Sequence, residues 1–553
     1  MSEINEETPM NHDSMPRSNG VLAFLVWSIV FGVSYTQAPL YYSNQNQYFL
    51  HGLARAGLGH LDQDWLANTK DPAPVFSFIV EMTDRFLDQN CFYVFYLLLL
   101  GFYFHQLTGL FSVLTGDKAN RLAKLAFMTS LVVLHAGLVR LISARIFGVD
   151  YPWYFQAGVA GQYLLGFGLQ PSVAGVFLIA SILAFARDQR WRAIGWACLA
   201  GILHGTYLLG AAMLVFSSLL LECRQGRFRA AFAQGLAALV LVAPVVIYNL
   251  IAFSPTSAAE FAESQSILVH FRIPHHAEPE RWFDGIALCQ VAWVLLSLVL
   301  IRGSKLCWIL SIVFVLSLLL TLVQIGTHSD TLALLFPWRT SAILVPLATA
   351  IILAKLVRRL DSWLARRSAG HAFLIKVSCG AILAVMMVGG ILIEVFEWGY
   401  RTNPSELPLL EFVKTHQKGG DVYLLPVSLP KLGAGPKGAA STNFTPAPRA
   451  GKSGHLIAVD LQRFRIVTGA PVFVDFKSIP YKDVEVLEWR RRLLWAEKIY
   501  SQRDWNQAAL LHELAQNGIT HVVTSADCDM QDNASKLVYE DASYRIYAMR
   551  DKE

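Results

Sequence analysis

The chain has 553 residues, of which 54% are hydrophobic and only 16% are charged. About a quarter of the residues of an ordinary soluble globular protein are charged, so this composition, with a mean hydropathy of +0.41, excludes that class and indicates an integral membrane protein. The net charge of +5 is concentrated in short connectors between apolar runs, and no basic stripe with interleaved aromatic residues occurs, so nucleic-acid binding is not predicted.

The N-terminal residues 1–19 are acidic, and Arg17 is the only basic residue close to the first apolar run. A cleaved signal peptide needs a positively charged start, which this segment lacks. We therefore expect 1–19 to be a cytoplasmic tail and the first apolar run to be retained as an anchor.

Apolar runs long enough to cross a membrane fill the region 20–400. They lie at 21–37, 91–114, 122–141, 171–187, 230–253, 286–302, 306–325, 338–357 and 372–397. A longer, Gly-interrupted run at 193–221 is basic at both ends, so it should form two short helices that turn near His204. The sequence predicts an α-helical polytopic membrane protein with about eleven transmembrane helices.

Charge sorts the connectors into two groups. The short basic ones are 115–121, 187–192, 222–229, 302–305 and 355–371. Basic loops stay on the cytoplasmic side, so the alternating connectors should be exported. We expect loops 38–90 and 254–285 and the tail 401–553 to lie together on the exported side.

The exported loop 38–90 begins with an amphipathic pattern. Its polar members are Asn44, Gln47, His51 and Arg55, and its apolar members are Phe49, Leu50, Leu53 and Leu61. Helical spacing of this kind favours a helix that lies flat on the outer membrane surface, ended by Gly57 and Gly59. Asp71, followed by prolines, should start another helix through Leu87.

Asp62 and Asp64 follow the two glycines, with one residue between them. Two carboxylates at the lip of a membrane cavity suit binding of a divalent cation, Mg or Mn, or removal of a proton from a sugar hydroxyl. Asp62 fits equally well as a solvated turn residue or a helix cap. The sequence leaves both interpretations open.

A second cluster lies in the exported loop 254–285, where Arg272 stands among His270, His275 and His276. Three histidines and an arginine within seven residues make a suitable pocket for a phosphate or pyrophosphate. A transition-metal site is the alternative, although no Cys or H-E-x-x-H spacing accompanies the histidines.

Arg339 stands at the outer end of the run 338–357, where an arginine is costly unless it meets an anion. It could hold a lipid phosphate, or it could form a salt bridge with Asp330. His204 and His51 join the candidate substrate-binding residues, since the predicted topology places both on the same exported side. A structural role is the alternative for His204.

The tail 401–553 has the pattern of a small α/β domain. Helices are predicted at 405–417, 482–500 and 505–516, and strands at 421–427, 462–468, 471–476, 519–525, 536–540 and 543–549. Loop 430–454 is rich in Gly and Pro and is expected to be disordered or a lid. Charged residues between 463 and 490 either contact an acceptor saccharide or form the polar face of helix 482–500.

In architecture the whole chain resembles the GT-C class of membrane glycosyltransferases, with an acidic first exported loop, about a dozen spans and an exported α/β tail. A closer resemblance, to an uncharacterised family of bacterial polytopic membrane proteins, rests on short motifs. These are Tyr42-Ser43-Asn44-Gln45-Asn46, Asp64-Trp65, Arg272-Ile273-Pro274-His275-His276, Phe464-Arg465, Val474-Asp475-Phe476-Lys477 and Glu488-Trp489. The GT-C resemblance implies that Asp64 or Asp62 is the catalytic base or metal ligand.

The same resemblance implies a sugar donor carried on a polyprenyl phosphate or pyrophosphate, and a saccharide or lipid acceptor at the periplasmic face of a bacterial inner membrane. In this hypothesis Arg272, His275, His276 and Arg339 offset the charge of the leaving phosphate. Two other classes remain as alternatives: a transporter or flippase, and a noncatalytic subunit of an envelope polysaccharide assembly system.

Overall fold

The computed structural model describes residues 17–116, 120–364, 369–400, 403–427, 429, 461–501, 508–530 and 535–549. The predicted loop 430–454 and most of the predicted N-terminal tail lie outside these residues.

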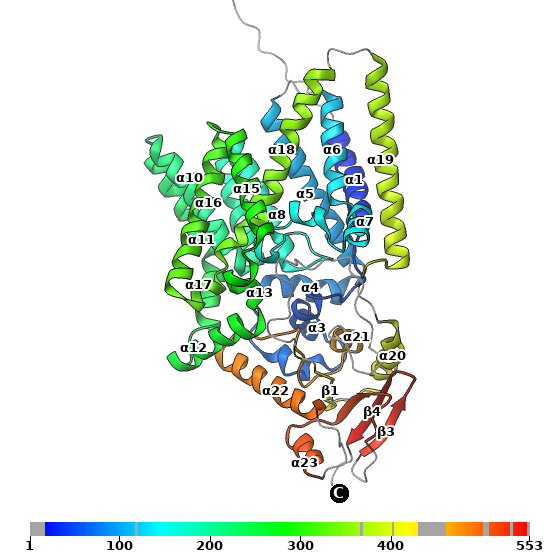
Figure 1. The fold of residues 1–553 in the computed structure, drawn as a ribbon. Helices are drawn as coiled ribbons and strands as arrows, with labels where there is room; N and C mark the ends of the chain where they lie inside the picture. Colours follow the sequence, from blue (N-terminus) through cyan, green and yellow to red (C-terminus); the bar gives the residue numbers. More distant parts are fainter. Residues whose placement is uncertain are drawn as a thin grey trace, which may run out of the picture.

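A bundle of long helices forms the upper part of the molecule in Figure 1. Its members are α1 (Arg17–Tyr35), α5 (Cys91–Thr115), α6 (Arg121–His135), α7 (Gly137–Phe147), α8 (Val176–Ala186), α9 (Arg190–Leu203), α10 (Leu208–Arg224), α11 (Phe228–Ala252), α15 (Gly285–Leu300), α16 (Lys305–Thr327), α18 (Ser341–Leu364) and α19 (Ala369–Phe396). In the described residues six helices are long and apolar enough to cross a membrane, or seven if the bent pair α6 and α7 is one span. The protein is therefore a helical membrane protein, and the count of eleven crossings stays a prediction.

The predicted turn near His204 is confirmed. Helix α9 ends at Leu203, His204 has extended backbone angles, and the short 3-10 helix η6 (Gly205–Tyr207) leads into α10. The two helices pack against each other, so the chain returns toward the end of the bundle from which it came.

Ion pairs join three of the basic connectors at one end of the bundle. Glu222 accepts hydrogen bonds from Arg190 at 2.6 Å and from Arg227 at 2.6 Å. Asp188 and Lys305 are 2.5 Å apart at their closest atoms. Connectors 187–192, 222–229 and 302–305 therefore lie together, as their shared charge predicts.

The segments predicted to be exported gather at the opposite end, below the bundle in Figure 1. They are α2 (Gln45–Tyr48), α3 (Leu50–Ala56), α4 (Pro74–Phe86), α12 (Ala258–Ser266), the π-helical segment η7 (Ile267–Arg272), α13 (Pro274–Ala277), α14 (Pro279–Trp282) and the C-terminal elements. Hydrogen bonds cross between them: Gln47 donates to the Tyr481 hydroxyl at 2.9 Å, and the Thr256 backbone N–H donates to Asp483 at 2.6 Å.

The predicted amphipathic helix is present as α2 and α3, but its apolar face packs against protein instead of the expected membrane surface, while Arg55 on its polar face stays exposed. Leu50 and Leu53 are fully buried, and His51 on the polar face is buried as well. Gly52 allows the close approach of α3 to α4, since a Cβ atom there would lie 2.5 Å from the Ser77 carbonyl oxygen. The predicted start of α4 is confirmed, with Asp71 accepting a hydrogen bond from the Ala73 N–H.

The C-terminal elements form a four-stranded sheet with helices beside it. The strands β1 (Tyr423–Leu424), β2 (His521–Ser525), β3 (Ser535–Glu540) and β4 (Tyr544–Met549) are ordered β1-β2-β4-β3, with β1 parallel to β2 and the other pairs antiparallel. The helices are α20 (Leu407–His416), α21 (Phe464–Thr468), α22 (Asp483–Ser501) and α23 (Ala508–Gln516). Most predicted elements of the tail are thus present.

Two of the predicted strands are not strands. Residues 464–468 form helix α21, and in 471–476 only Val472 pairs with a strand residue, Tyr423. A close contact between two glycines explains the change: His60 N–H donates to the Gly469 carbonyl at 2.8 Å, and a Cβ atom on Gly59 would lie 2.5 Å from that oxygen. Gly469 ends α21 with a φ of 73°, a left-handed angle that suits glycine.

Asp64 joins the first loop to this C-terminal segment. Its side chain is fully buried, and one oxygen accepts hydrogen bonds from the N–H groups of Leu66 at 2.9 Å and Ala67 at 3.1 Å. The other oxygen accepts from Arg465 Nε at 2.7 Å and from the Val472 N–H at 2.8 Å. Arg465 also pairs with Asp475. The Asp64 carboxylate thus accepts four hydrogen bonds and has no contact with water.

We expect Asp64→Asn to lower the free energy of unfolding by about 3 kcal/mol, because the amide N–H₂ would face two other donors in a buried site. The measurement is the thermal unfolding midpoint of the purified full-length protein in detergent. Asp62→Asn is the matched control, since Asp62 is exposed and its substitution should change stability by no more than about 0.5 kcal/mol. Equal midpoints for the Asp64 and Asp62 variants would contradict the structural role.

Candidate functional site

The two candidate acids of the first loop do not share one environment. Asp62 is exposed, whereas Asp64 is buried with both oxygens engaged. To act as a base or a cation ligand, Asp64 would have to leave Arg465. Among the described residues no group of three or more His, Cys, Asp or Glu side chains is arranged to hold a metal ion. The divalent cation and the catalytic roles of these acids stay predictions.

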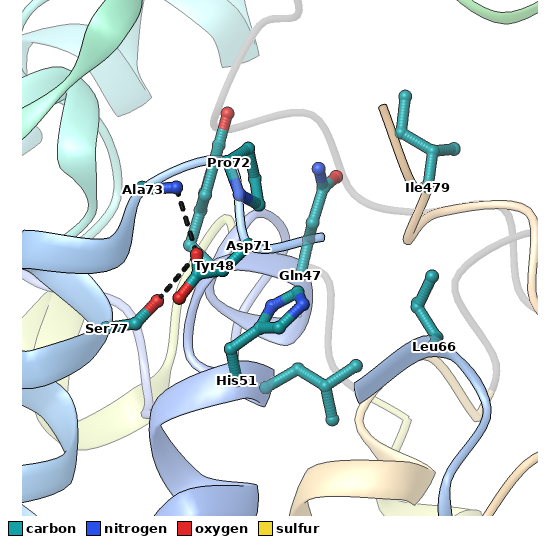
Figure 2. A pocket seen from close by; sticks show the side chains of 10 residues that line it. Gln47, Tyr48, His51, Leu66, Asp71, Pro72, Ala73, Ser77 and Ile479 are labelled. Atoms are coloured by element: carbon teal, nitrogen blue, oxygen red, sulfur yellow. Dashed lines mark hydrogen bonds between the residues drawn. The ribbon is translucent and has the colours of Figure 1, made fainter. Parts of the chain in front are cut away.

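His51 lines a small recess between α3 and α4, shown in Figure 2 with Gln47, Tyr48 and Asp71. The recess has a volume of about 10 Å³, enough for one water molecule. One ring nitrogen of His51 is 3.2 Å from the Thr69 carbonyl oxygen, and burial lowers the pKa of the imidazole. His51 is thus a buried neutral side chain beside Tyr48.

Arg272 is the last residue of the π-helical segment η7. The π-helix is rare in proteins overall, but where it occurs it is often at a functional site. Its Nη2 donates to the Lys477 carbonyl oxygen at 2.7 Å, and its guanidinium lies over the Phe476 ring, 4.9 Å from the centroid. Its Nε has no hydrogen-bond partner among the described residues. The loop between α12 and α15 therefore meets the C-terminal segment at this arginine.

His275 and His276 follow in α13, with ring centroids 4.1 Å apart. His276 Nδ1 is 2.6 Å from the Ala160 carbonyl oxygen, and the His276 carbonyl accepts a hydrogen bond from Trp338 Nε1 at 3.1 Å. Trp338 is the residue next to Arg339, so these contacts hold the histidine loop against the start of α18.

Arg339 reaches toward the turn between α9 and α10. Its Nη2 is 3.4 Å from His204 Nε2, and its guanidinium lies over the Tyr207 ring, 5.1 Å from the centroid. The alternative salt bridge with Asp330 is absent from the described structure, because Asp330 instead lies 3.2 Å from His270. Neither Arg339 Nε nor His204 Nδ1 has a hydrogen-bond partner in the described part of the chain.

The structure thus brings together the predicted phosphate-binding residues and adds Lys477. We call Arg272, His275, His276, Arg339 and Lys477 the cationic cluster. Within the described residues none of the three cations among them forms an ion pair with an acid. Burial, the neighbouring His275 and the positive charges of Arg339 and Arg272 keep the pKa of His276 well below its usual range. Both arginines therefore act on the same imidazole.

The pKa values of two further members show the same excess of positive charge. Burial and the charge of Arg272 lower the pKa of Lys477 to about 7. His275 is exposed at the surface of the cluster, and partial desolvation followed by the charges of Arg272, Lys477 and Arg281 lowers the pKa of its imidazole to about 4. His275 is accordingly neutral at pH 7, while Lys477 is near the midpoint of its titration.

Sequence patterns missed the wall of the site that is formed by the connector before α8. Residues 148–175 contain only short 3-10 helices, yet many of them are buried, and Ala160 has a left-handed φ of 57°. Its carbonyl is the one that contacts His276. Apolar periodicity does not detect such a segment; its density of Gly, Tyr and Gln is the available signal.

Comparison with known proteins finds one match to a family. Residues 452–496 match a family described as a domain of unknown function (DUF6798). No curated protein matches the chain in sequence. The matched part includes Arg465, which pairs with Asp64, and Lys477 of the cationic cluster. The similarity thus covers the C-terminal residue of the Asp64–Arg465 ion pair and the C-terminal residue of the cationic cluster.

Proposed function

We propose that the cationic cluster binds the phosphate of a lipid-linked sugar donor, and that the protein is a membrane glycosyltransferase of the GT-C type. The observation that carries the proposal is the group Arg272, Arg339 and Lys477, none of which forms an ion pair among the described residues. Asp475, the acid whose charge reaches Arg272 and Lys477, is already paired with Arg465. Cations that lose hydration without a counter-ion are costly, and a phosphate group would supply both charge and acceptor atoms. The resemblance to GT-C enzymes supports sugar transfer as the reaction.

In the proposed reaction an acceptor hydroxyl oxygen attacks the anomeric carbon of the donor sugar. The bond from that carbon to the phosphate oxygen breaks, and the phosphate leaves with the electron pair. The hydroxyl proton passes to a base. The arginines of the cluster would stabilise the negative charge that develops on the leaving phosphate.

His275 is better placed than Asp64 to take that proton in the described conformation. Its imidazole is neutral at pH 7 and keeps solvent contact, whereas both oxygens of Asp64 already accept hydrogen bonds in a buried site. With a pKa of about 4, His275 has the base strength of a carboxylate. Asp64 then acts on the reaction only through the position of the C-terminal segment.

The same proposal places the cationic cluster on the exported, periplasmic side of a bacterial inner membrane. Besides the six long helices and the bent pair, three shorter apolar helices occur, at Gly20–Tyr35, Pro171–Ala186 and Gly285–Leu300. With α9 they bring the number of crossings to eleven, an odd number that puts the two chain ends on opposite sides. Short basic connectors favour the cytoplasm for the end that carries Arg190 and Lys305.

Removing either arginine of the cluster should weaken donor binding. We expect Arg272→Ala and Arg339→Ala to reduce the affinity for a polyprenyl-phosphate sugar by about tenfold or more, because each removes a charge-assisted contact to phosphate. The measurement is binding of a labelled donor to the full-length protein in proteoliposomes, together with transfer of the label.

Arg490→Ala is the matched control, since Arg490 is 40% exposed and only 3.8 Å from Glu263 at the rim of the same region. It should bind the donor like the unmodified protein. Donor binding without transfer to any saccharide or lipid acceptor would favour the noncatalytic assembly subunit, and release of the donor on the other side of the bilayer would favour a flippase. Unchanged binding in both cluster variants would refute the phosphate site.

Donor affinity should also depend on pH through Lys477. In the free protein the pKa of Lys477 is about 7, and a bound anion raises this pKa. The affinity for the donor is therefore highest below pH 7, where Lys477 is charged, and it falls by up to tenfold per pH unit above about pH 7. Lys477→Arg keeps the charge at all these pH values and should give a flat profile. A phosphodiester donor titrated from pH 6 to pH 9 tests this, and identical profiles for both proteins would exclude Lys477 from the site.

Reporter fusions test the proposed orientation. A fusion after residue 365 should report the cytoplasm and a fusion after residue 420 the periplasm, because one span, α19, separates them. Alkaline phosphatase is active only after export, so its activity in the two fusions gives the answer. The same compartment for both would overturn the orientation and the periplasmic position of the cluster.

A further inference from the structure

A cavity of about 620 Å³ lies at the end of the bundle that carries the basic connectors, away from the cationic cluster. Helices α5, α8, α9 and α11 form its walls. The inner part is apolar, with Leu183, Leu199, Ile202 and Leu241 among its lining residues. Its volume is in the range of small-molecule and cofactor sites.

Two arginines, Arg187 and Arg192, line the cavity at the connector 187–192. Both are exposed, and within the described residues neither forms an ion pair. The two acids in the adjoining connectors are already paired: Glu222 with Arg190 and Arg227, and Asp188 with Arg190 and Lys305. Arg187 and Arg192 are therefore available to an anion from outside the protein.

A polar side chain deeper in the cavity supplies a second, independent observation. Gln106 of α5 is 91% buried and lines the cavity, yet its amide makes no hydrogen bond to another described residue. Its amide is open to the cavity, so it is available to a ligand that carries a hydrogen-bonding group at that depth. Ester carbonyl oxygens of a glycerolipid are acceptors of this kind.

The geometry points to a binding site for one anionic membrane lipid, with its phosphate on Arg187 and Arg192 and an acyl chain in the apolar part. Arg192 and Ile202 both line the cavity from α9, and ten residues of helix separate them by roughly 15 Å. A soluble anion would use the arginines and leave this depth unfilled. Basic pockets between transmembrane helices are known to bind anionic headgroups.

Gly195 offers a direct test, because it lines the cavity and a Cβ atom there would meet no heavy atom within 4 Å. Gly195→Leu should fill the cavity without disturbing the packing of α9, since Leu also favours helix more than Gly does. Gly380→Leu is the matched control: Gly380 has equal space for a Cβ atom and lies in α19, which packs against α1, α6 and α7, none of which contributes a residue to the cavity lining.

The measurement is native mass spectrometry of the full-length protein in detergent, titrated with phosphatidylglycerol. We expect Gly195→Leu and the double variant Arg187→Gln/Arg192→Gln to weaken binding about tenfold or more. Gly380→Leu and the double variant Arg229→Gln/Arg302→Gln, which removes two charges from the same end outside the cavity lining, should bind like the unmodified protein.

Two further arms identify the source of the phosphate. Zwitterionic phosphatidylcholine should bind about tenfold more weakly than phosphatidylglycerol, and millimolar glycerol 3-phosphate should not displace the bound lipid. Equal affinity for the two lipids, displacement by glycerol 3-phosphate, or unchanged binding in Gly195→Leu would each overturn the proposal. If the double arginine variant fails to fold, the Gly195 variant still decides the outcome.

Discussion

The buried pair of Asp64 and Arg465 is the interaction on which the exported end of the molecule depends. Asp64 follows two glycines in the first loop, and Arg465 lies in α21, 401 residues later. Two buried charges are costly unless they meet with full hydrogen bonding, and here every oxygen of Asp64 has its donors. Because α21 is held in this way, the segment from Val472 to Lys477 follows at a defined place, and its carbonyl at Lys477 meets Arg272.

The same arrangement explains why the cationic cluster tolerates its excess of positive charge. Acids are present in this part of the molecule, but these four are paired with other residues. Asp64 and Asp475 form ion pairs with Arg465, and Glu278 and Asp330 flank His270. Arg272 and Arg339 keep their place through aromatic rings and backbone contacts instead. The fold thus directs the acids to structural pairs and leaves the arginines, Lys477 and neutral imidazoles for a ligand.

Local sequence patterns predicted several helices and strands of the tail. Helix α22 and strands β2, β3 and β4 lie within a few residues of their predicted positions. The strand predicted at 462–468 is wrong because its β-branched residues suit a strand, while Gly59 and Asp64 impose a helix from a distance. The grouping of Arg272, His275, His276 and Arg339 was predictable from the alternation of basic connectors. The burial of Asp64 was not, since periodicity carries no information about a partner four hundred residues away.

That long separation also sets an order of events during synthesis. At roughly 5–20 residues per second, Arg465 leaves the ribosome between about 20 and 80 seconds after Asp64. During this interval the first loop and the bundle exist without the segment that neutralises Asp64 and supplies Lys477. A chain that is cut short before α21 has a nearly complete membrane part and an incomplete cationic cluster, so the cluster forms only in chains whose translation has passed Lys477.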